Sequence, residues 1–252
     1  MLAKNTDEVV QILDTIIAKA IKDRNPIGFF PAMYRQVTLK VKVGIKNNFF
    51  DDAARMEQFT TLFANRYFAA LDEFQKTGKT TRSWKVAFEA LSKSELLIAQ
   101  HLLLGINAHI NLDLGIVAVQ ISPGNKLATL KNDFDKINKI LGDLVDDVEA
   151  VIGKLSPLFN ILDQVGGRTD EALINFSIKK ARQDAWIHAQ LLNNQSEPFK
   201  EMMINVIDSK VAFLGQIVVN PGRTVNKAID LIKKTENKDV PTIINSLNAI
   251  VK

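Results

Sequence analysis

The chain of 252 residues lacks cysteine altogether, and it contains only three histidines, two tryptophans and two tyrosines. Without cysteine it can form no disulfide, no zinc–thiolate centre and no thiol nucleophile. It also lacks a glycine-rich phosphate-binding loop, a Gly-x-Ser-x-Gly elbow and a His-Glu-x-x-His sequence. These absences exclude several large enzyme classes and leave the function to be sought in individual residues.

A strong charge of one sign is missing as well. The 32 lysines and arginines exceed the 28 aspartates and glutamates by only 4. No basic run with interleaved aromatic residues occurs, so we expect no nucleic-acid partner. Residues 1–8 lack the basic start and the apolar run of a signal peptide. We therefore expect a cytoplasmic protein.

Helical periodicity is present in nearly every segment, and strand-like alternation is scarce. We expect an all-α fold in which residues 1–252 form a single domain, a bundle of about nine helices around a buried central helix near Ser94–Ile121. No repeat of fixed period and no long linker requires a second domain. The other expected helices cover about 7–24 with Thr6 as N-cap, 31–46, 52–76 closed by Gly78, 82–91, 132–154, 169–193 with Thr169 as N-cap, 197–218 and two shorter segments near the end.

The central helix is apolar nearly all round, which indicates that it is buried. Polar side chains nevertheless interrupt it, namely Gln100, His101, Asn107, His109, Asn111 and Asp113. A buried polar group costs about 1–3 kcal/mol unless it is paired, so these side chains either form a satisfied network or line a site. The helix is long enough to cross a bilayer. Its polar patch at 107–113 would then lie in mid-membrane, so we expect no transmembrane segment.

At about 100° per residue the polar side chains of this helix fall on two opposite faces. One face carries His101, Gly105, His109 and Asp113, and the other carries Gln100, Asn107 and Asn111. We expect the amide face to be structural, because amides bridge neighbouring elements without ionising. His101 lies roughly 12 Å along the axis from His109, too far to share a metal ion with it. Gly105 leaves room for a ligand or for a neighbouring helix.

His109 and Asp113 are four residues apart, so their side chains can meet. This spacing serves three chemistries, of which the purely structural pair is the commonest. It could bind a metal through nitrogen and oxygen. The carboxylate could orient the imidazole as a general base. The two could also form a buried pair with no role beyond the fold.

A second histidine–carboxylate pair, Asp184 and His188, has the same spacing on the helix that follows Gly166-Gly167. The simpler interpretation is a core histidine satisfied by Asp184. The sharper hypothesis is that this pair and the pair on the central helix converge across two facing helices, as in the metal and cofactor sites of bundles. Arg182 and Trp186 form another i, i+4 pair, turned away from the first. They could stack on each other or hold an anionic group of a ligand.

The Asp51-Asp52-x4-Glu57 pattern is similar to the acidic clusters that hold magnesium and diphosphate in helical terpene cyclases. Helix capping by aspartate is the commoner explanation for such a pattern, and it is the one that we expect here.

Three segments together resemble an uncharacterised bacterial family, domain-of-unknown-function family 5995. They are FANRYF at Phe63–Phe68, LLGINAHINLDL at Leu103–Leu114 and ARQDAW at Ala181–Trp186. The resemblance extends over most of the chain and implies a single-domain, mostly helical protein, but it brings no established activity. The residues that match the recurring positions of the family are Asn107, His109, Asp113, Arg182 and Trp186.

A looser similarity is to the zinc-dependent phospholipase C and P1 nuclease group, whose helix reads His-x3-Asp-x5-His. After His101, this chain has Gly105 in place of the aspartate and Asn111 in place of the second histidine. The three-zinc site of that group also needs more than the three histidines present here. We therefore do not expect its chemistry to transfer intact.

The leading hypothesis is an enzyme with a central apolar pocket that acts by acid–base chemistry on a small, largely apolar substrate, lipid-like or isoprenoid-like. The residues expected in catalysis are His109, Asp113, Asp184 and His188, which would also be the ligands of a divalent metal if one is bound. The residues expected to bind substrate are Gly105, Asn107, Arg182 and Trp186. The sequence requires no cofactor and leaves the oligomeric state open. The alternatives are a non-catalytic helical ligand-binding or scaffolding protein, and a metal-dependent hydrolase distantly similar to the phospholipase C group.

Overall fold

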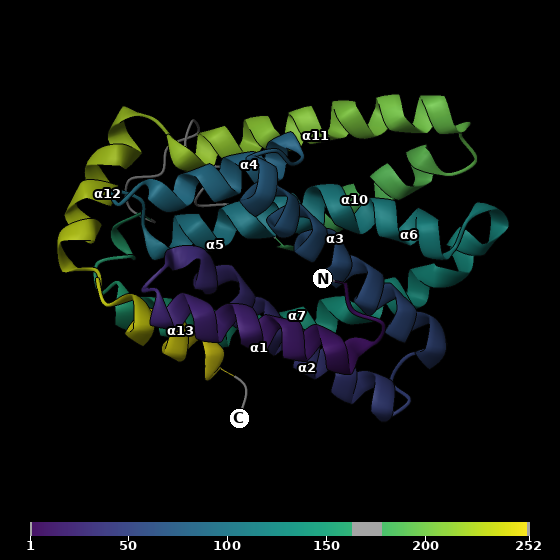
Figure 1. Cartoon of the computed structure of the whole chain (residues 1–252), viewed down its shortest axis with the longest axis horizontal. Helices are drawn as coiled ribbons and strands as arrows, with labels where there is room; N and C mark the ends of the chain where they lie inside the picture. The colour runs from purple at the N-terminus through teal and green to yellow at the C-terminus, as the bar shows by residue number, and fades with distance from the viewer. Residues whose placement is uncertain (1, 163–177, 251–252) are drawn as a thin grey trace.

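The computed structural model describes residues 2–162 and 178–250 (Figure 1). Over these residues the protein is all-α and contains no strand, as predicted. The main helices are α1 (Thr6–Lys22), α2 (Phe29–Lys46), α3 (Ala53–Thr77), α4 (Arg82–Glu89), α5 (Ile98–Ile106), α6 (Gly115–Ile121), α7 (Leu127–Leu155), α10 (Ile178–Leu192), α11 (Glu197–Val219), α12 (Arg223–Thr235) and α13 (Val240–Asn248). The start of the helix predicted at Thr169 lies outside the described residues.

The predicted central helix is present, but it is not a uniform α-helix. It consists of α5, then a π-helix η3 (Asn107–Leu114), then α6. This rod runs through the middle of the molecule, with α11 along one side and α1 and α2 along the other (Figure 1). The segment η3 packs against α3, α4, α10 and α11, so four other helices surround the polar patch.

Capping side chains determine where several helices begin. The Asp52 carboxylate accepts from the backbone N–H of Arg55 at 2.9 Å, and Gly78 closes α3 at φ +70°. The sequence predicts a cap at either Asp51 or Asp52 and an end at Gly78, and both ends follow the usual chemistry of helix termini. The prediction that Thr6 caps the first helix is wrong, because the Asn5 side chain accepts from the Glu8 N–H at 2.9 Å instead.

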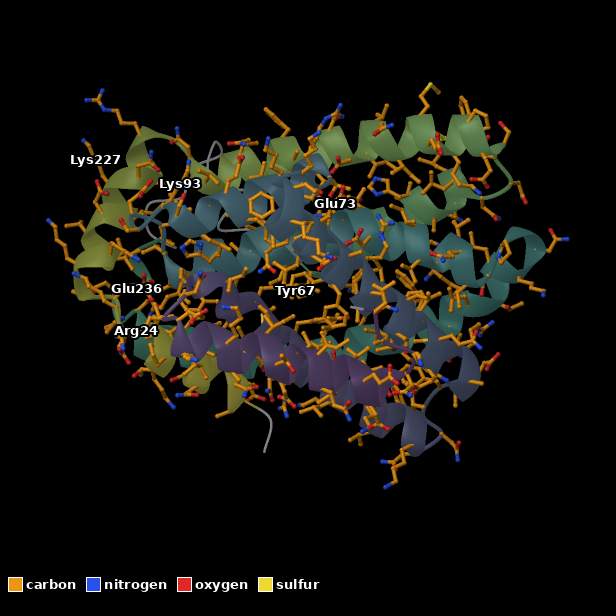
Figure 2. The ribbon with its side chains drawn as sticks, in the orientation of Figure 1. Arg24, Tyr67, Glu73, Lys93, Lys227 and Glu236 are labelled. Atoms are coloured by element: carbon orange, nitrogen blue, oxygen red, sulfur yellow. The ribbon has the colours of Figure 1, made fainter. Side chains whose placement is uncertain are left out.

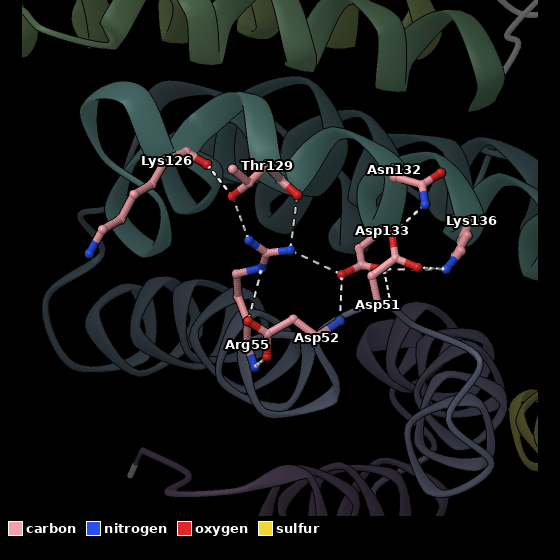
Figure 3. A network of polar contacts seen from close by, with 8 residues as sticks. All are labelled: Asp51, Asp52, Arg55, Lys126, Thr129, Asn132, Asp133 and Lys136. Carbon is pink, nitrogen blue, oxygen red and sulfur yellow. Dashed lines mark hydrogen bonds and ion pairs between the residues drawn. The ribbon is translucent and has the colours of Figure 1, made fainter.

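The acidic residues at 51–57 cap one helix and connect it to its neighbours, as helix capping predicts. Figure 3 shows the contacts of Asp51 and Asp52. The buried Asp133 carboxylate on α7 accepts from the backbone N–H groups of Asp51 and Asp52 at 2.6 and 3.1 Å. Arg55 donates to the same carboxylate at 3.1 Å. Glu57 accepts from the N–H and the hydroxyl of Thr6. The acids therefore join α3 to α1 and α7.

Two helices among the described residues are long and apolar enough to cross a membrane by length and composition. One is the central rod, Ile98–Ile121, which is 89% buried inside the protein. The other is α11, Glu197–Val219, which is only 28% buried. A mostly buried helix of this kind is typical of a protein core. The apolar outer side of α11 was not anticipated from the sequence.

Candidate active site at the π-helix

The π-helix η3 carries both His109 and Asp113, and each of its eight residues is buried. A π-helix pairs each carbonyl with the N–H five residues later, is rare, and is frequently found at functional sites. The hydrogen-bond pattern of the central rod therefore changes at the two residues that the sequence singled out.

Asp113 is fixed by two donors from different helices. Arg66 on α3 donates from Nε to Oδ1 at 2.9 Å, and Trp84 on α4 donates from Nε1 to Oδ2 at 2.8 Å. Burial opposes ionisation of this carboxyl, but the neighbouring His109, the Arg66 charge and the indole N–H outweigh it and hold its pKa below the usual value. Asp113 is therefore an anion whose orientation the bundle determines.

His109 lies beside this carboxylate inside an aromatic cage. Its ring stacks on Phe63 with centroids 3.5 Å apart and planes 9° apart, and it meets Tyr34 edge to face at 4.7 Å and Phe30 at 5.7 Å. Nδ1 is 3.6 Å from Oδ2 of Asp113, just beyond hydrogen-bond length. Burial lowers the pKa of His109, and the nearby Asp113 only partly offsets this effect. The ring is therefore neutral at pH 7.

Several buried polar atoms at this site have no hydrogen-bond partner within the part of the chain that the structure describes. They are both ring nitrogens of His109 and the hydroxyl of Tyr34. The nearby Thr38 hydroxyl donates to the Tyr34 backbone carbonyl at 3.0 Å. Burial raises the pKa of Tyr34, so its hydroxyl keeps its proton. Buried groups of this kind are uncommon in folded proteins and call for an explanation.

A small cavity lies beside this cage, and Phe30 lines both of them. Tyr67 and Trp84 line the cavity as well. Its volume is about 20 Å³, which suits about one water molecule. Tyr67 lies in the interior of the bundle (Figure 2). His101 also lines the cavity, and its Nδ1 is buried without a hydrogen-bond partner among the residues that the structure describes. Burial lowers the pKa of His101 to about 4, so this imidazole is neutral too.

Gly105 makes room for a neighbouring helix. A Cβ at this position would lie 2.6 Å from Cδ2 of Phe30. The glycine therefore lets Phe30 on α2 approach the rod, and it also lines the small cavity. Room for a neighbouring helix is the second of the two possibilities that the sequence left open.

The amide face of the rod is structural, in agreement with the two-face prediction. Gln100 donates to the Val218 carbonyl at 2.7 Å, and Asn107 donates to the Val211 carbonyl at 2.9 Å. Asn111 donates to the side-chain oxygen of Asn107 at 2.9 Å. These bonds fasten the rod to α11. Asn107 is thus engaged on the α11 side, and the structure does not bring it to the His109 cage.

Arg182 and Trp186 lie against α7 and do not reach the cage. The Arg182 guanidinium donates to Asn138 at 2.7 Å and to the Phe134 carbonyl, and it lies 4.3 Å from the centre of the Phe134 ring. The Trp186 ring packs on Phe134 as well, at 4.9 Å. Burial lowers the pKa of Arg182 to about 9. Both side chains therefore connect α10 to α7, because they lie on the side of α10 that faces that helix.

The predicted convergence of two histidine–carboxylate pairs does not occur. Helix α10 does pack on η3 and α6, and it comes so close that a Cβ on Gly115 would lie 2.7 Å from the Ala185 carbonyl. His188, however, contacts the backbone carbonyl of Asn111 at 3.1 Å through Nδ1, and Asp184 is only half-buried. Burial lowers the pKa of His188. Across residues 2–162 and 178–250, no three His, Asp or Glu side chains are grouped as a metal ion would require.

Sequence reasoning gave no role at the site to Tyr34, Phe63, Arg66 or Trp84. Phe63 and Arg66 belong to the FANRYF segment that carried part of the family resemblance, and that signal could have led to them. Trp84 is one of only two tryptophans and is almost fully buried. The partners of Asp113 come from helices distant in sequence, so its spacing to His109 gives no information about them.

Comparison with known proteins gives one match. A family profile, described as a family of unknown function (DUF5995), covers residues 6–221. No curated protein and no solved structure matches the chain. The match covers most of the chain and includes η3, Arg66 and Trp84, in agreement with the resemblance seen in the sequence. The chain therefore belongs to the family of unknown function DUF5995.

Proposed function

We propose that the protein is an enzyme that acts by acid–base chemistry on a small, largely apolar molecule at the His109–Asp113 site. The observation that carries this proposal is the buried, neutral His109 ring, neither nitrogen of which has a hydrogen-bond partner among residues 2–162 and 178–250. Leaving such groups unpaired costs about 1–3 kcal/mol each. Perturbed titratable groups held against a specific charge partner are typical of functional sites.

His109 is the general base in this proposal. Its Nδ1 faces the Asp113 carboxylate at 3.6 Å, so the proton resides on Nδ1 and Nε2 accepts a proton from the substrate. The imidazolium that forms is stabilised by Asp113, which Arg66 and Trp84 keep ionised and oriented. A base oriented by a carboxylate in this way is a common catalytic arrangement. The Tyr34 hydroxyl, which keeps its proton, donates to a substrate oxygen.

The walls of the site favour a hydrocarbon. Phe30, Phe63 and Trp84 surround the imidazole, and a site made of aromatic walls with few polar groups binds mostly apolar molecules. The substrate class is therefore an apolar chain or ring that carries one hydroxyl, carbonyl or ester group. In the closed form the adjoining cavity holds about one water, so binding requires the Phe30 or Phe63 ring to rotate.

The first test is binding, followed through Trp84. In a Trp186→Phe background Trp84 is the only tryptophan, and its ring lies 6.0 Å from that of His109. We expect a saturable change in its fluorescence with decanol or decyl acetate, and conversion of a member of this panel detected by mass spectrometry. His109→Phe should abolish both. An unchanged binding curve in that variant would exclude His109 from the site.

Stability separates a functional histidine from a structural one. Replacing an unpaired buried polar group by an apolar group of similar shape is neutral or stabilising, so His109→Phe should melt at the same temperature as the wild type or higher. His188→Phe is the matched control, since His188 has a partner in the Asn111 carbonyl. It should melt lower and keep binding. Loss of cooperative melting in His109→Phe would contradict the proposal.

The competing function is non-catalytic binding of the same class of ligand. The small volume of the cavity favours it, because a carrier can open for its ligand without a preformed reaction site. Saturable binding of decanol without conversion of any member of the panel would support this alternative. The metal-dependent hydrolase has no comparable support, because Asp113 is already engaged by Arg66 and Trp84.

A further inference from the structure

The outer side of α11 exposes large apolar side chains that the bundle does not use. Phe199, Met202, Val206 and Phe213 are 45, 50, 65 and 65% exposed. The inner side of the same helix is buried against α4, α5 and η3. In Figure 1, α11 lies along the outer edge of the molecule. The helix therefore has one apolar side in the core and a second one facing outward.

The exposed apolar area is at the upper end of what a monomer usually shows. Helix α10, which packs against α11, adds Ile187 and Leu191, 51 and 47% exposed. At about 200 Å² for a large apolar side chain, the six residues together expose about 600 Å². Contiguous apolar patches beyond a few hundred Å² mark interaction surfaces.

Three of these side chains are placed symmetrically along α11. Phe199 and Phe213 each lie seven residues from Val206, so all three fall on one side of the helix. Reversing the direction of the helix about Val206 exchanges the two phenylalanines and leaves Val206 in place, while Met202 exchanges with Lys210. A surface that maps onto itself in this way is what a two-fold, isologous contact requires.

We propose that the outer side of α11 is a homodimer interface in which two copies pair antiparallel about a two-fold axis at Val206. Phe199 of each copy then packs against Phe213 of the other. Lys210 is the exposed charged residue nearest the axis, and its hydrocarbon stem covers Met202 of the other copy while its ammonium group reaches water. Complete burial of the six apolar side chains in both copies would remove about 1,200 Å² from solvent, at the lower end of the range of roughly 1,200–2,000 Å² for stable complexes.

Charge favours a second copy over a lipid surface. The charged residues on the solvent-facing parts of α11 are Glu197, Lys200, Glu201 and Lys210. Two acids and two bases give no net attraction to anionic headgroups, whereas helices that lie on membranes are rich in lysine and arginine. The same balance causes no repulsion between two copies.

Mass in solution is the first test. Wild-type protein at micromolar concentration should give twice the chain mass of 28.1 kDa in light scattering or sedimentation. Val206→Glu should halve that mass, with an unchanged helical circular dichroism spectrum because the residue is exposed. Leu231→Glu is the matched control, a 49% exposed leucine on α12, and should remain dimeric. A monomeric wild type, or a dimeric Val206→Glu variant, would overturn the proposal.

Cross-linking tests the antiparallel arrangement. Because the chain contains no cysteine, only the introduced cysteines can form a disulfide. Val206→Cys should form a covalent dimer under mild oxidation. A mixture of Phe199→Cys and Phe213→Cys proteins should cross-link to each other, while Phe199→Cys alone should not. Cross-linking of Phe199→Cys alone would show parallel pairing. Binding of a monomeric wild type to phosphatidylcholine vesicles, lost in Val206→Glu, would assign the surface to lipid and refute the dimer.

Discussion

The buried polar residues in and around the central rod fall into two groups. Some have a hydrogen-bond partner among the described residues, and others have none. Gln100 and Asn107 have carbonyls of α11 to donate to. His109 and Tyr34 have none in the described chain. The sequence predicted the two faces of the rod correctly, because spacing alone determines which side a residue occupies. It could not predict which group is satisfied, because the partners come from distant helices.

Acid should destabilise the fold through its histidines. Burial holds the pKa of His101 at about 4 and lowers those of His109 and His188 from 6.5. Below pH 6.5 the unfolded chain takes up protons that the folded chain does not bind. The free energy of unfolding therefore decreases as the pH decreases, by up to about 1.4 kcal/mol per pH unit for each histidine. Urea denaturation at several pH values between 7 and 4 measures this slope.

His101→Asn should reduce that slope, because one fewer histidine takes up a proton on unfolding. The slopes of the free energy of unfolding against pH should differ most between variant and wild type near pH 4 to 5, and least at pH 7. Equal slopes would mean that His101 titrates alike in the folded and unfolded chains, contrary to its burial.

Gly105→Ala should destabilise the protein although alanine favours helices. The new methyl group would lie 2.6 Å from the Phe30 ring, and overpacking of this kind costs about 1–3 kcal/mol. Gly142→Ala is the matched control, an exposed glycine of α7 with no atom within 4 Å of the added Cβ. It should gain up to about 1 kcal/mol from helix propensity. Thermal melting of both variants tests this prediction. Equal shifts in melting temperature would refute the steric argument.

At the scale of elements, periodicity and capping predicted most helices well. The bounds of α3 and α11 differ from prediction by a residue or two. Helix α7 begins at Leu127, about five residues before its predicted start. The π-helix was not predictable, because its apolar pattern is also that of an α-helix. The sequence thus located the His109–Asp113 pair, but the contacts that turn it into a site depend on the packing of α2, α3 and α4 around η3.

Removing the Asp133 carboxylate should loosen the start of α3. It accepts from two backbone N–H groups and from Arg55 (Figure 3), and losing one member of a buried charged network costs about 3 kcal/mol. We expect a loss of this size in Asp133→Ala by urea denaturation. Asp135→Ala, which removes an exposed carboxylate on the same helix, should cost under about 0.5 kcal/mol. Similar losses in the two variants would contradict this assignment.

For the whole molecule, the hydrophobic core extends beyond the part of the chain that the family profile covers. The match stops at 221, yet the helices beyond it bury Val225, Ile232 and Ile244. Glu236 accepts from the N–H of Ile98 at 3.1 Å, at the beginning of the central rod. Residues 223–248 therefore belong to the same core as the helices that precede them.

A chain that ends at residue 221 should fail to fold cooperatively. It loses the cover over α1 and α2 that α13 provides and leaves the first turn of α5 without its Glu236 acceptor. We expect a broad thermal transition and strong binding of an anionic naphthalene dye, both signs of loosened packing. A chain that ends at residue 248 is the control and should melt like the full chain. Sharp melting of the shorter chain would show that the last helices are dispensable.

The contact of α13 with α1 and α2 also determines the order of events during synthesis. The first helix leaves the ribosome more than two hundred residues before the helix that covers it. Its other neighbours, α2 and α3, emerge soon after it, but the side of α1 that packs against α13 stays uncovered until α13 has been made. Contacts between distant segments slow folding and expose apolar surface to aggregation. We therefore expect nascent chains of this protein to depend on chaperones until the last helix has emerged.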